Sequence, residues 1–149
     1  MNALAKFNAL ALAEKMLFLE AWLGLVAVRI ALACRRFENV LAAYRLARVE
    51  VADSDTASTD IGTVRKIRSA IARAAPRVPF DAACLPQAMV AAGMLSRRGL
   101  PARMRLGGRR THDSDWAFHA WTSSADVLAT PADAQGHTPV AVFERRIAK

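Results

Sequence analysis

The first third of the chain has the hydrophobic pattern of an α-helix. Between residues 4 and 48 Ala and Leu dominate and no proline occurs. Large apolar side chains recur there at intervals of three and four: Leu12, Met16, Leu19, Leu23 and Val26. We predict one long helix or two abutting helices, within an apolar helical segment of residues 1–50. This segment either covers the core or presents an apolar face to a partner or a membrane surface.

A polar stretch follows this segment and ends at a second helix. Residues 52–60 combine acidic residues with Ser and Thr, which predicts a linker that ends in an N-cap at Thr59 or Asp60. Pro76 and Pro79 stop the helix. Its apolar residues have helical spacing: Val64, Ile67 and Ile71. Its other faces are basic and form either solvated surface or a docking site for an acidic partner: Arg65, Lys66, Arg68 and Arg73.

A third helix is predicted from Cys84 onwards. It ends with Arg97 and Arg98, which favour the negative end of the helix dipole, and Gly99 supplies the left-handed cap. One face of this helix is apolar: Leu85, Met89, Ala92 and Leu95.

After Pro101 the hydrophobic period changes from that of a helix to that of a strand. Apolar residues alternate with arginines until Gly107 and Gly108, where we expect the strand to end. Three more strands are predicted at residues 116–122, 127–130 and 140–143. The fold class is therefore α+β, with N-terminal helices followed by a small antiparallel sheet.

The length of 149 residues fits a single domain, 1–149, in which residues 84–149 supply a helix and the sheet. The hydrophobic fraction of 54% is high, so a membrane span has to be considered. Glu20 and Arg29 interrupt the most apolar stretch, and no uncharged run reaches the roughly 18–20 residues that a span needs. We predict no membrane span, no secretory signal and a cytoplasmic location.

The basic composition limits the classes of partner. Lys and Arg number 21 against 13 Asp and Glu, and the net charge of +8 favours acidic partners or polyanions. No zinc-finger, homeodomain or RNP-type motif occurs, so we expect no nucleic-acid partner. Cys34 and Cys84 lie in segments of different character, and we expect both to be reduced. His112 and His137 are expected to be exposed. No metal-ligand spacing joins them to the cysteines, so no metal or cofactor is expected.

Two residues are candidates for catalysis. Pro86 has no backbone N–H and belongs in the first turn of its helix, which places Cys84 at or next to the helix N-terminus. The dipole and the free N–H groups there stabilise a thiolate and could hold an oxyanion. His119, in the middle of a predicted strand, is the candidate base. The alternative is that both are structural residues.

The order of these motifs resembles a known family. Residues 84–108, CLPQAMVAAGMLSRRGLPARMRLGG, and FHAW at 118–121 are similar to the leader peptidases of lasso-peptide biosynthesis. The pattern of these transglutaminase-like enzymes is Cys-Leu, an apolar helix, an Arg-rich Gly-(Ile/Leu)-Pro-Ala turn, a strand that ends in Gly, and His-Ala-Trp. The apolar N-terminal helix and the strand TPVAVF at 138–143 fit as well.

The resemblance implies a Cys-His-Asp peptidase, with Cys84 as nucleophile and His119 as base. The family's acid follows the strand after the histidine, and the matching stretch VLAT has Thr130 at that position. Asp126 and Asp133 are the nearest acidic residues. Asp126 is expected at a hairpin tip, too far along the strand, so Asp133 is our choice for the third catalytic residue.

The family also implies a biological role. The substrate would be a ribosomally made lasso-peptide precursor, whose leader is removed before an ATP-dependent cyclase closes the ring. A small leader-binding protein would be a separate partner, because the chain is too short to contain that domain. The alternatives are a transglutaminase-like acyltransferase and a catalytically degenerate module that binds peptides.

Overall fold

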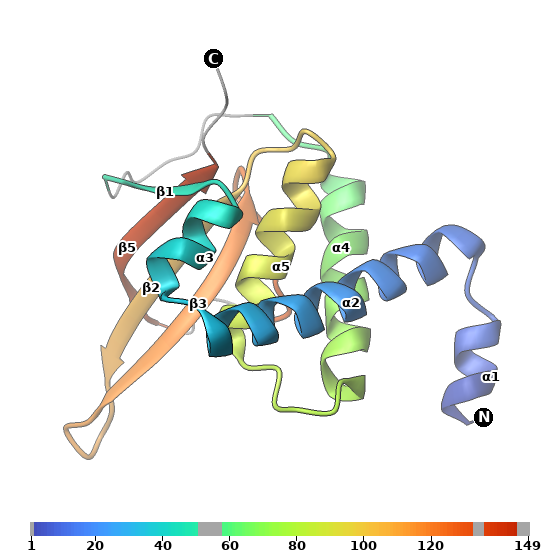
Figure 1. Ribbon diagram of the computed structural model, residues 1–149, viewed down its shortest axis with the longest axis horizontal. Helices are drawn as coiled ribbons and strands as arrows, with labels where there is room; N and C mark the ends of the chain where they lie inside the picture. The colour runs from blue at the N-terminus through green and yellow to red at the C-terminus, as the bar shows by residue number, and fades with distance from the viewer. Residues whose placement is uncertain (1, 51–57, 133–135, 146–149) are drawn as a thin grey trace.

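The computed structural model describes residues 2–50, 58–132 and 136–145 of the chain. The described part folds into helices on one face of an antiparallel sheet, as Figure 1 shows. The helices are α1 (Ala3–Asn8), α2 (Leu12–Cys34), α3 (Phe37–Ala43), α4 (Ile61–Ala74), the 3₁₀ turn Ala75–Arg77, and α5 (Cys84–Arg97). The strands are β1 (Leu46–Val49), β2 (Arg103–Arg110), β3 (Trp116–Ser124), β4 (Val127–Leu128) and β5 (Thr138–Arg145), in the spatial order β1-β5-β2-β3-β4. The predicted α+β class is confirmed.

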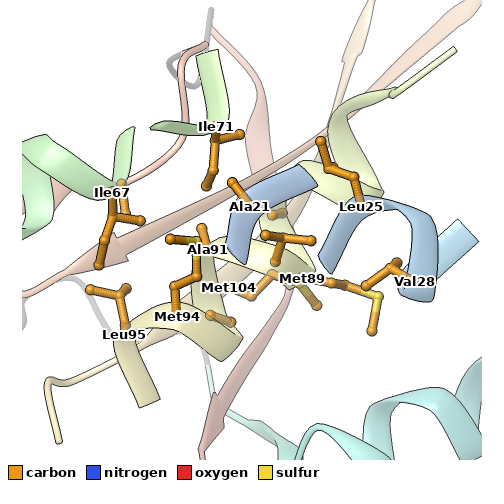
Figure 2. Packing of buried hydrophobic residues seen from close by; sticks show 14 of the residues in the cluster. Ala21, Leu25, Val28, Ile67, Ile71, Met89, Ala91, Met94, Leu95 and Met104 are labelled. Carbon is orange, nitrogen blue, oxygen red and sulfur yellow. The ribbon is translucent and has the colours of Figure 1, made fainter. Parts of the chain in front are cut away.

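The core lies where α2 crosses α4 and α5 above the sheet (Figure 2). Leu25 of α2, Ile67 of α4, Met89 of α5 and Met104 of β2 are completely buried in one cluster. Removing each such side chain from water stabilises the fold by about 1.5–3 kcal/mol. Helix α5 is therefore held between the sheet and two other helices.

The N-terminal segment differs from the prediction of helix over residues 4–48. The helices end at Ala43, and Leu46–Val49 forms strand β1, which pairs with β5. The break occurs at Arg45, whose φ of 55° is incompatible with a right-handed helix. The prediction of one long or two abutting helices is therefore wrong, and the sheet has a strand more than expected.

Helix α2 is apolar on two faces. One face packs into the core through Ala21, Leu25 and Val28. The opposite face leaves five large apolar side chains exposed, which we call the α2 row: Leu12, Met16, Leu19, Leu23 and Ile30. By length and composition alone α2 could cross a membrane, but its inner face is part of the core of this domain.

The ends of α4 and α5 agree with the prediction. Asp60 is the N-cap of α4 and accepts hydrogen bonds from the Thr63 backbone N–H at 3.2 Å and from its hydroxyl at 2.7 Å. These hydrogen bonds lower the pKa of Asp60 below its ordinary value. Helix α5 begins at Cys84 and is followed by Gly99 at a φ of +67°, which a residue with a Cβ rarely adopts.

Strand β2 continues through the glycines that were expected to end it. Gly107 lies at an irregularity in the pairing with β5, between Leu106 and Gly107. A Cβ on Gly107 would lie 2.8 Å from the Trp121 ring and 2.9 Å from the carbonyl oxygen of Thr138. The glycine therefore allows close approach from two sides, and the prediction that the strand ends there is wrong.

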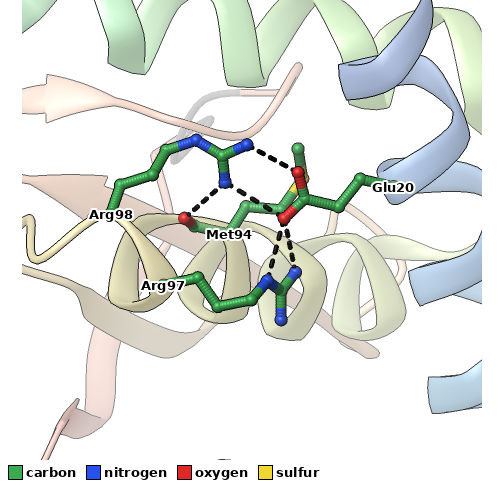
Figure 3. A network of polar contacts seen from close by, with 4 residues as sticks. All are labelled: Glu20, Met94, Arg97 and Arg98. Atoms are coloured by element: carbon green, nitrogen blue, oxygen red, sulfur yellow. Dashed lines mark hydrogen bonds and ion pairs between the residues drawn. The ribbon is translucent and has the colours of Figure 1, made fainter.

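A charged network joins α2 to the end of α5 (Figure 3). Arg97 Nε donates to Glu20 Oε1 at 2.9 Å, and Arg98 Nη2 donates to Glu20 Oε2 at 2.6 Å. Arg98 Nη1 also donates to the carbonyl oxygen of Met94 at 2.9 Å. Burial raises the pKa of Glu20, but the hydrogen bonds and charges of Arg98 and Arg97 outweigh it and hold the pKa below its ordinary value.

We predict that Glu20→Gln lowers the free energy of unfolding by about 1–2 kcal/mol near neutral pH, because the two arginines lose a charged acceptor. The folded-state pKa of Glu20 is lowered, so its contribution is complete above the unfolded-state pKa and disappears as the pH falls through the folded-state pKa. Urea unfolding at about pH 7 and about pH 3 measures this difference. The exposed Glu38 serves as the control, and an equal loss in Glu38→Gln, or a Glu20 effect that persists in acid, would contradict the prediction.

Candidate active site

Cys84 is the first residue of α5, as the position of Pro86 predicted. The preceding N-cap residue, Ala83, is extended and has no side chain to cap the helix. Cys84 is half-buried and its thiol is free. The thiol therefore lies at the positive end of a 14-residue helix, where backbone N–H groups can stabilise a thiolate or an oxyanion.

Two hydrogen bonds position this end of α5. Gln87 Nε2 donates to the carbonyl oxygen of Ala82 at 2.6 Å and fixes the chain that leads into the helix. The buried hydroxyl of Thr122 on β3 donates to the carbonyl oxygen of Ala88 at 2.7 Å. Ala88 is about one turn beyond Cys84, so β3 sets the distance of the thiol from the sheet.

His119 lies on β3 but on the other face of the strand from Thr122. Side chains alternate along a strand, so Thr122 points to α5 while His119 and Trp121 point away from it. The rings of His119 and Trp121 stack at 5.8 Å between centroids and an angle of 16°. His119 Nε2 is buried and has no hydrogen-bond partner among the residues that the structure describes. Such an atom costs about 1–3 kcal/mol unless a substrate or another group satisfies it.

His137 lies beside His119, which the sequence did not predict. Its ring centroid is 5.3 Å from that of His119, and its exposed fraction is 8%. The prediction that His137 is exposed is therefore wrong, whereas His112 is exposed as expected. Gly136, at a φ of +74°, turns the chain into β5 and brings His137 against the sheet. Gly136 is the sequence signal that could have indicated a tight turn directly before β5.

The candidates for the third catalytic residue are in different places. Asp126 is exposed in the turn between β3 and β4, as expected for a hairpin tip. Thr130 is buried and accepts a 3.4 Å hydrogen bond from the Thr122 backbone N–H. Asp133, our choice, lies outside the described residues. Over the ranges that the structure does describe, no cluster of three His, Cys, Asp or Glu residues could hold a metal ion.

The structure places α5 and β3 side by side but does not join the two candidate side chains (Figure 1). Within the described part of the chain, His119 Nε2 has no hydrogen-bond partner, and the His119 side chain points away from α5, which begins at Cys84. Cys34, the other thiol, is exposed at the end of α2 and belongs to no such arrangement. The geometry thus gives a thiol at a helix N-terminus next to a strand that carries, on its other face, an imidazole with a buried Nε2.

Comparison with known families identifies the class of protein. The profile of the transglutaminase-like superfamily matches residues 24–142, which is most of the chain, and the chain belongs to this superfamily. The superfamily covers cysteine peptidases and acyltransferases, and its members usually act through Cys, His and Asp. Searches of curated proteins and of solved structures gave no match.

Proposed function

We propose that this protein is a cysteine peptidase that removes the leader from a ribosomally made lasso-peptide precursor. The observation that carries the proposal is the free thiol of Cys84 at the uncapped N-terminus of α5, in a transglutaminase-like domain. The resemblance of residues 84–108 and 118–121 to the lasso leader peptidases supports the substrate class.

The reaction follows the chemistry of a cysteine nucleophile. His119 accepts the proton of the Cys84 thiol, and the sulfur attacks the peptide carbonyl carbon to form a carbon–sulfur bond. Backbone N–H groups at the start of α5 stabilise the negatively charged oxygen. His119 donates its proton to the leaving amine as the carbon–nitrogen bond breaks. Water then attacks the thioester, loses a proton to His119 and releases the carboxylic acid and the thiol.

His119 points away from α5 in the structure, so the proposal requires its imidazole to reach the Cys84 thiol around the edge of β3. The unsatisfied Nε2 of His119 supports a role as proton acceptor, since buried polar atoms in proteins usually have partners. We propose Asp133 as the residue that orients His119, with Asp126 as the alternative. The neighbouring His137 can also limit the orientation of the His119 ring.

The partners are part of the proposal. The precursor is the substrate, an ATP-dependent cyclase uses the product, and a separate small protein binds the leader. The α2 row and the groove beside it form the docking surface for this leader-binding partner. Met16, Leu19 and Leu23 form the apolar side of this groove, and Lys66 and Arg98 form its basic side.

We predict that Cys84→Ala abolishes precursor cleavage without unfolding the protein, because a half-buried residue at a helix start contributes little packing. Cys34→Ala is the matched control and should cleave at the rate of the parent protein, since Cys34 is exposed. Mass spectrometry of the products over time measures both. A transferred amine in place of hydrolysis would indicate the acyltransferase, and parent-like cleavage by Cys84→Ala would exclude both activities.

We predict that His119→Ala lowers kcat/KM about as much as loss of Cys84, because the members of a catalytic unit are strongly non-additive. The rate of Cys84 alkylation by iodoacetamide near neutral pH should fall in the same variant, since the base no longer accepts the thiol proton. Asp133→Asn should cost more activity than Asp126→Asn. Unchanged alkylation in His119→Ala would show that the two residues do not act together.

We predict slow precursor cleavage by this protein alone and an increase of at least about tenfold when the leader-binding protein is added, because tethering raises the local substrate concentration. Leu19→Ser and Leu23→Ser, on the exposed row of α2, should reduce the increase but leave the unassisted rate unchanged. Ile61→Ser, an exposed apolar residue on α4, is the control. Full-speed cleavage by the isolated protein would contradict the prediction.

A further inference from the structure

Two exposed aromatic rings lie on β3 next to His119. Trp116 and Phe118 are 57% and 73% exposed, and their rings stack at 6.5 Å between centroids and an angle of 20°. Gly108 lies beneath them, where a Cβ would be 3.4 Å from the Trp116 ring. The Arg110 guanidinium lies 5.8 Å from the centroid of the Trp116 ring. We call these three side chains the aromatic platform; an exposed aromatic surface of this kind is typical of a binding site.

The strand that carries the platform has an open edge. Strand β4 pairs only with Ser123 and Ser124 of β3. Thr122 directs both its backbone groups to the β4 side, because its oxygen accepts from Ala129 N–H at 2.8 Å and its N–H donates to Thr130. By the alternation of an antiparallel ladder, the N–H and C=O groups of Trp116 and Phe118, both exposed residues, point the same way. In the part of the chain that the structure describes, no strand pairs with them.

The beginning of α5, with Cys84, points toward the end of β3 that carries the platform. Ser96, near the end of α5, accepts a 2.5 Å hydrogen bond from Arg145, and Ala88 accepts one from Thr122. Glu144 of β5, Arg103 of β2 and Ser123 of β3 are paired side by side across the sheet. Arg145 comes directly after Glu144, so its contact with Ser96 places the end of α5 near the Ser123 end of β3. Its beginning therefore points toward the hairpin between β2 and β3, as Figure 1 shows.

We propose that the open edge of β3 binds the substrate as an added strand, with an aromatic or large apolar side chain of the peptide on the platform. This inference rests on the proposed peptidase function and specifies how that site recognises its substrate. Unpaired backbone groups along a strand are complementary to another extended backbone, and the aromatic rings provide a pocket for one side chain. The two exposed residues that offer backbone hydrogen bonds, Trp116 and Phe118, directly precede His119 on the strand, so the bound peptide ends next to His119.

Charge argues against a second copy of the chain as the occupant of this edge. A second copy of the chain would bring another net charge of +8, with its own Arg109 and Arg110, against the first. A peptide chain with an apolar or aromatic residue meets no such repulsion.

The test uses the Cys84→Ala protein, so that binding is measured without turnover. The probes are two fluorescein-labelled decapeptide mixtures, one with Phe and one with Ser at a fixed central position, and Ala, Ser or Thr elsewhere. Fluorescence anisotropy should show at least about tenfold tighter binding of the Phe mixture. Adding Trp116→Ser and Phe118→Ser should remove this preference. Adding Val140→Ser, another exposed apolar change in a strand, should leave it intact.

Peptide N-methylation tests the added strand directly. A single Phe peptide from the mixture is methylated on alternate backbone nitrogens, in two sets. One set should abolish binding and the other should be tolerated, because alternate N–H groups of an added strand face its neighbour. Equal binding of the two methylated sets would overturn the proposal. So would an unchanged preference for the Phe mixture after Trp116→Ser and Phe118→Ser, or dimerisation of the protein that Phe118→Ser abolishes. If these peptides bind as expected but the parent protein cleaves no precursor, the peptidase function fails while the binding site stands.

Discussion

The hydrogen bond from Thr122 to the carbonyl oxygen of Ala88 connects the two halves of the candidate active site. The Thr122 side chain is completely buried, and its hydroxyl reaches a main-chain group in the second turn of α5. Apolar packing alone would allow α5 to slide along the sheet, because such contacts are not directional. This bond fixes the helix against β3 at one position, and Cys84 precedes it by about one turn. The place of the nucleophile therefore depends on one buried donor in the strand that also carries His119.

The helical layer holds α5 in place but leaves the outer face of α2 exposed. Helix α2 packs against α4 and α5 through its inner face, and Glu20 ties it to Arg97 and Arg98 at the far end of α5. Both ends of α5 are thus attached, one to the sheet and one to α2. The exposed row on the outer face of α2 has the four-three spacing that suits another helix, so the same element can support the site on one side and a partner on the other.

The sequence was sufficient to predict the ends of those helices that begin or end at a capping residue, a proline or a glycine. Asp60 and Pro76 predicted the limits of α4, and Pro86 and Gly99 predicted those of α5, because these residues act on the backbone next to them. Strand β1 was missed because the chain leaves the helical conformation through Arg45, a non-glycine residue in the left-handed region. Gly107 was misread because the need for it comes from Trp121 on the next strand. The burial of His137 likewise depends on the sheet against which it packs.

The place of β5 in the sheet has a consequence for how the domain folds. This strand is the last described element along the chain, yet it lies inside the sheet, between β1 and β2. Leu46 is paired with Arg145, so the sheet joins segments that lie about 100 residues apart in the sequence. Contacts between such distant segments form slowly, because the whole intervening loop must close first. During synthesis the helices can form early, but the sheet that carries His119 is completed only after β5 has emerged, so the domain acquires its site late.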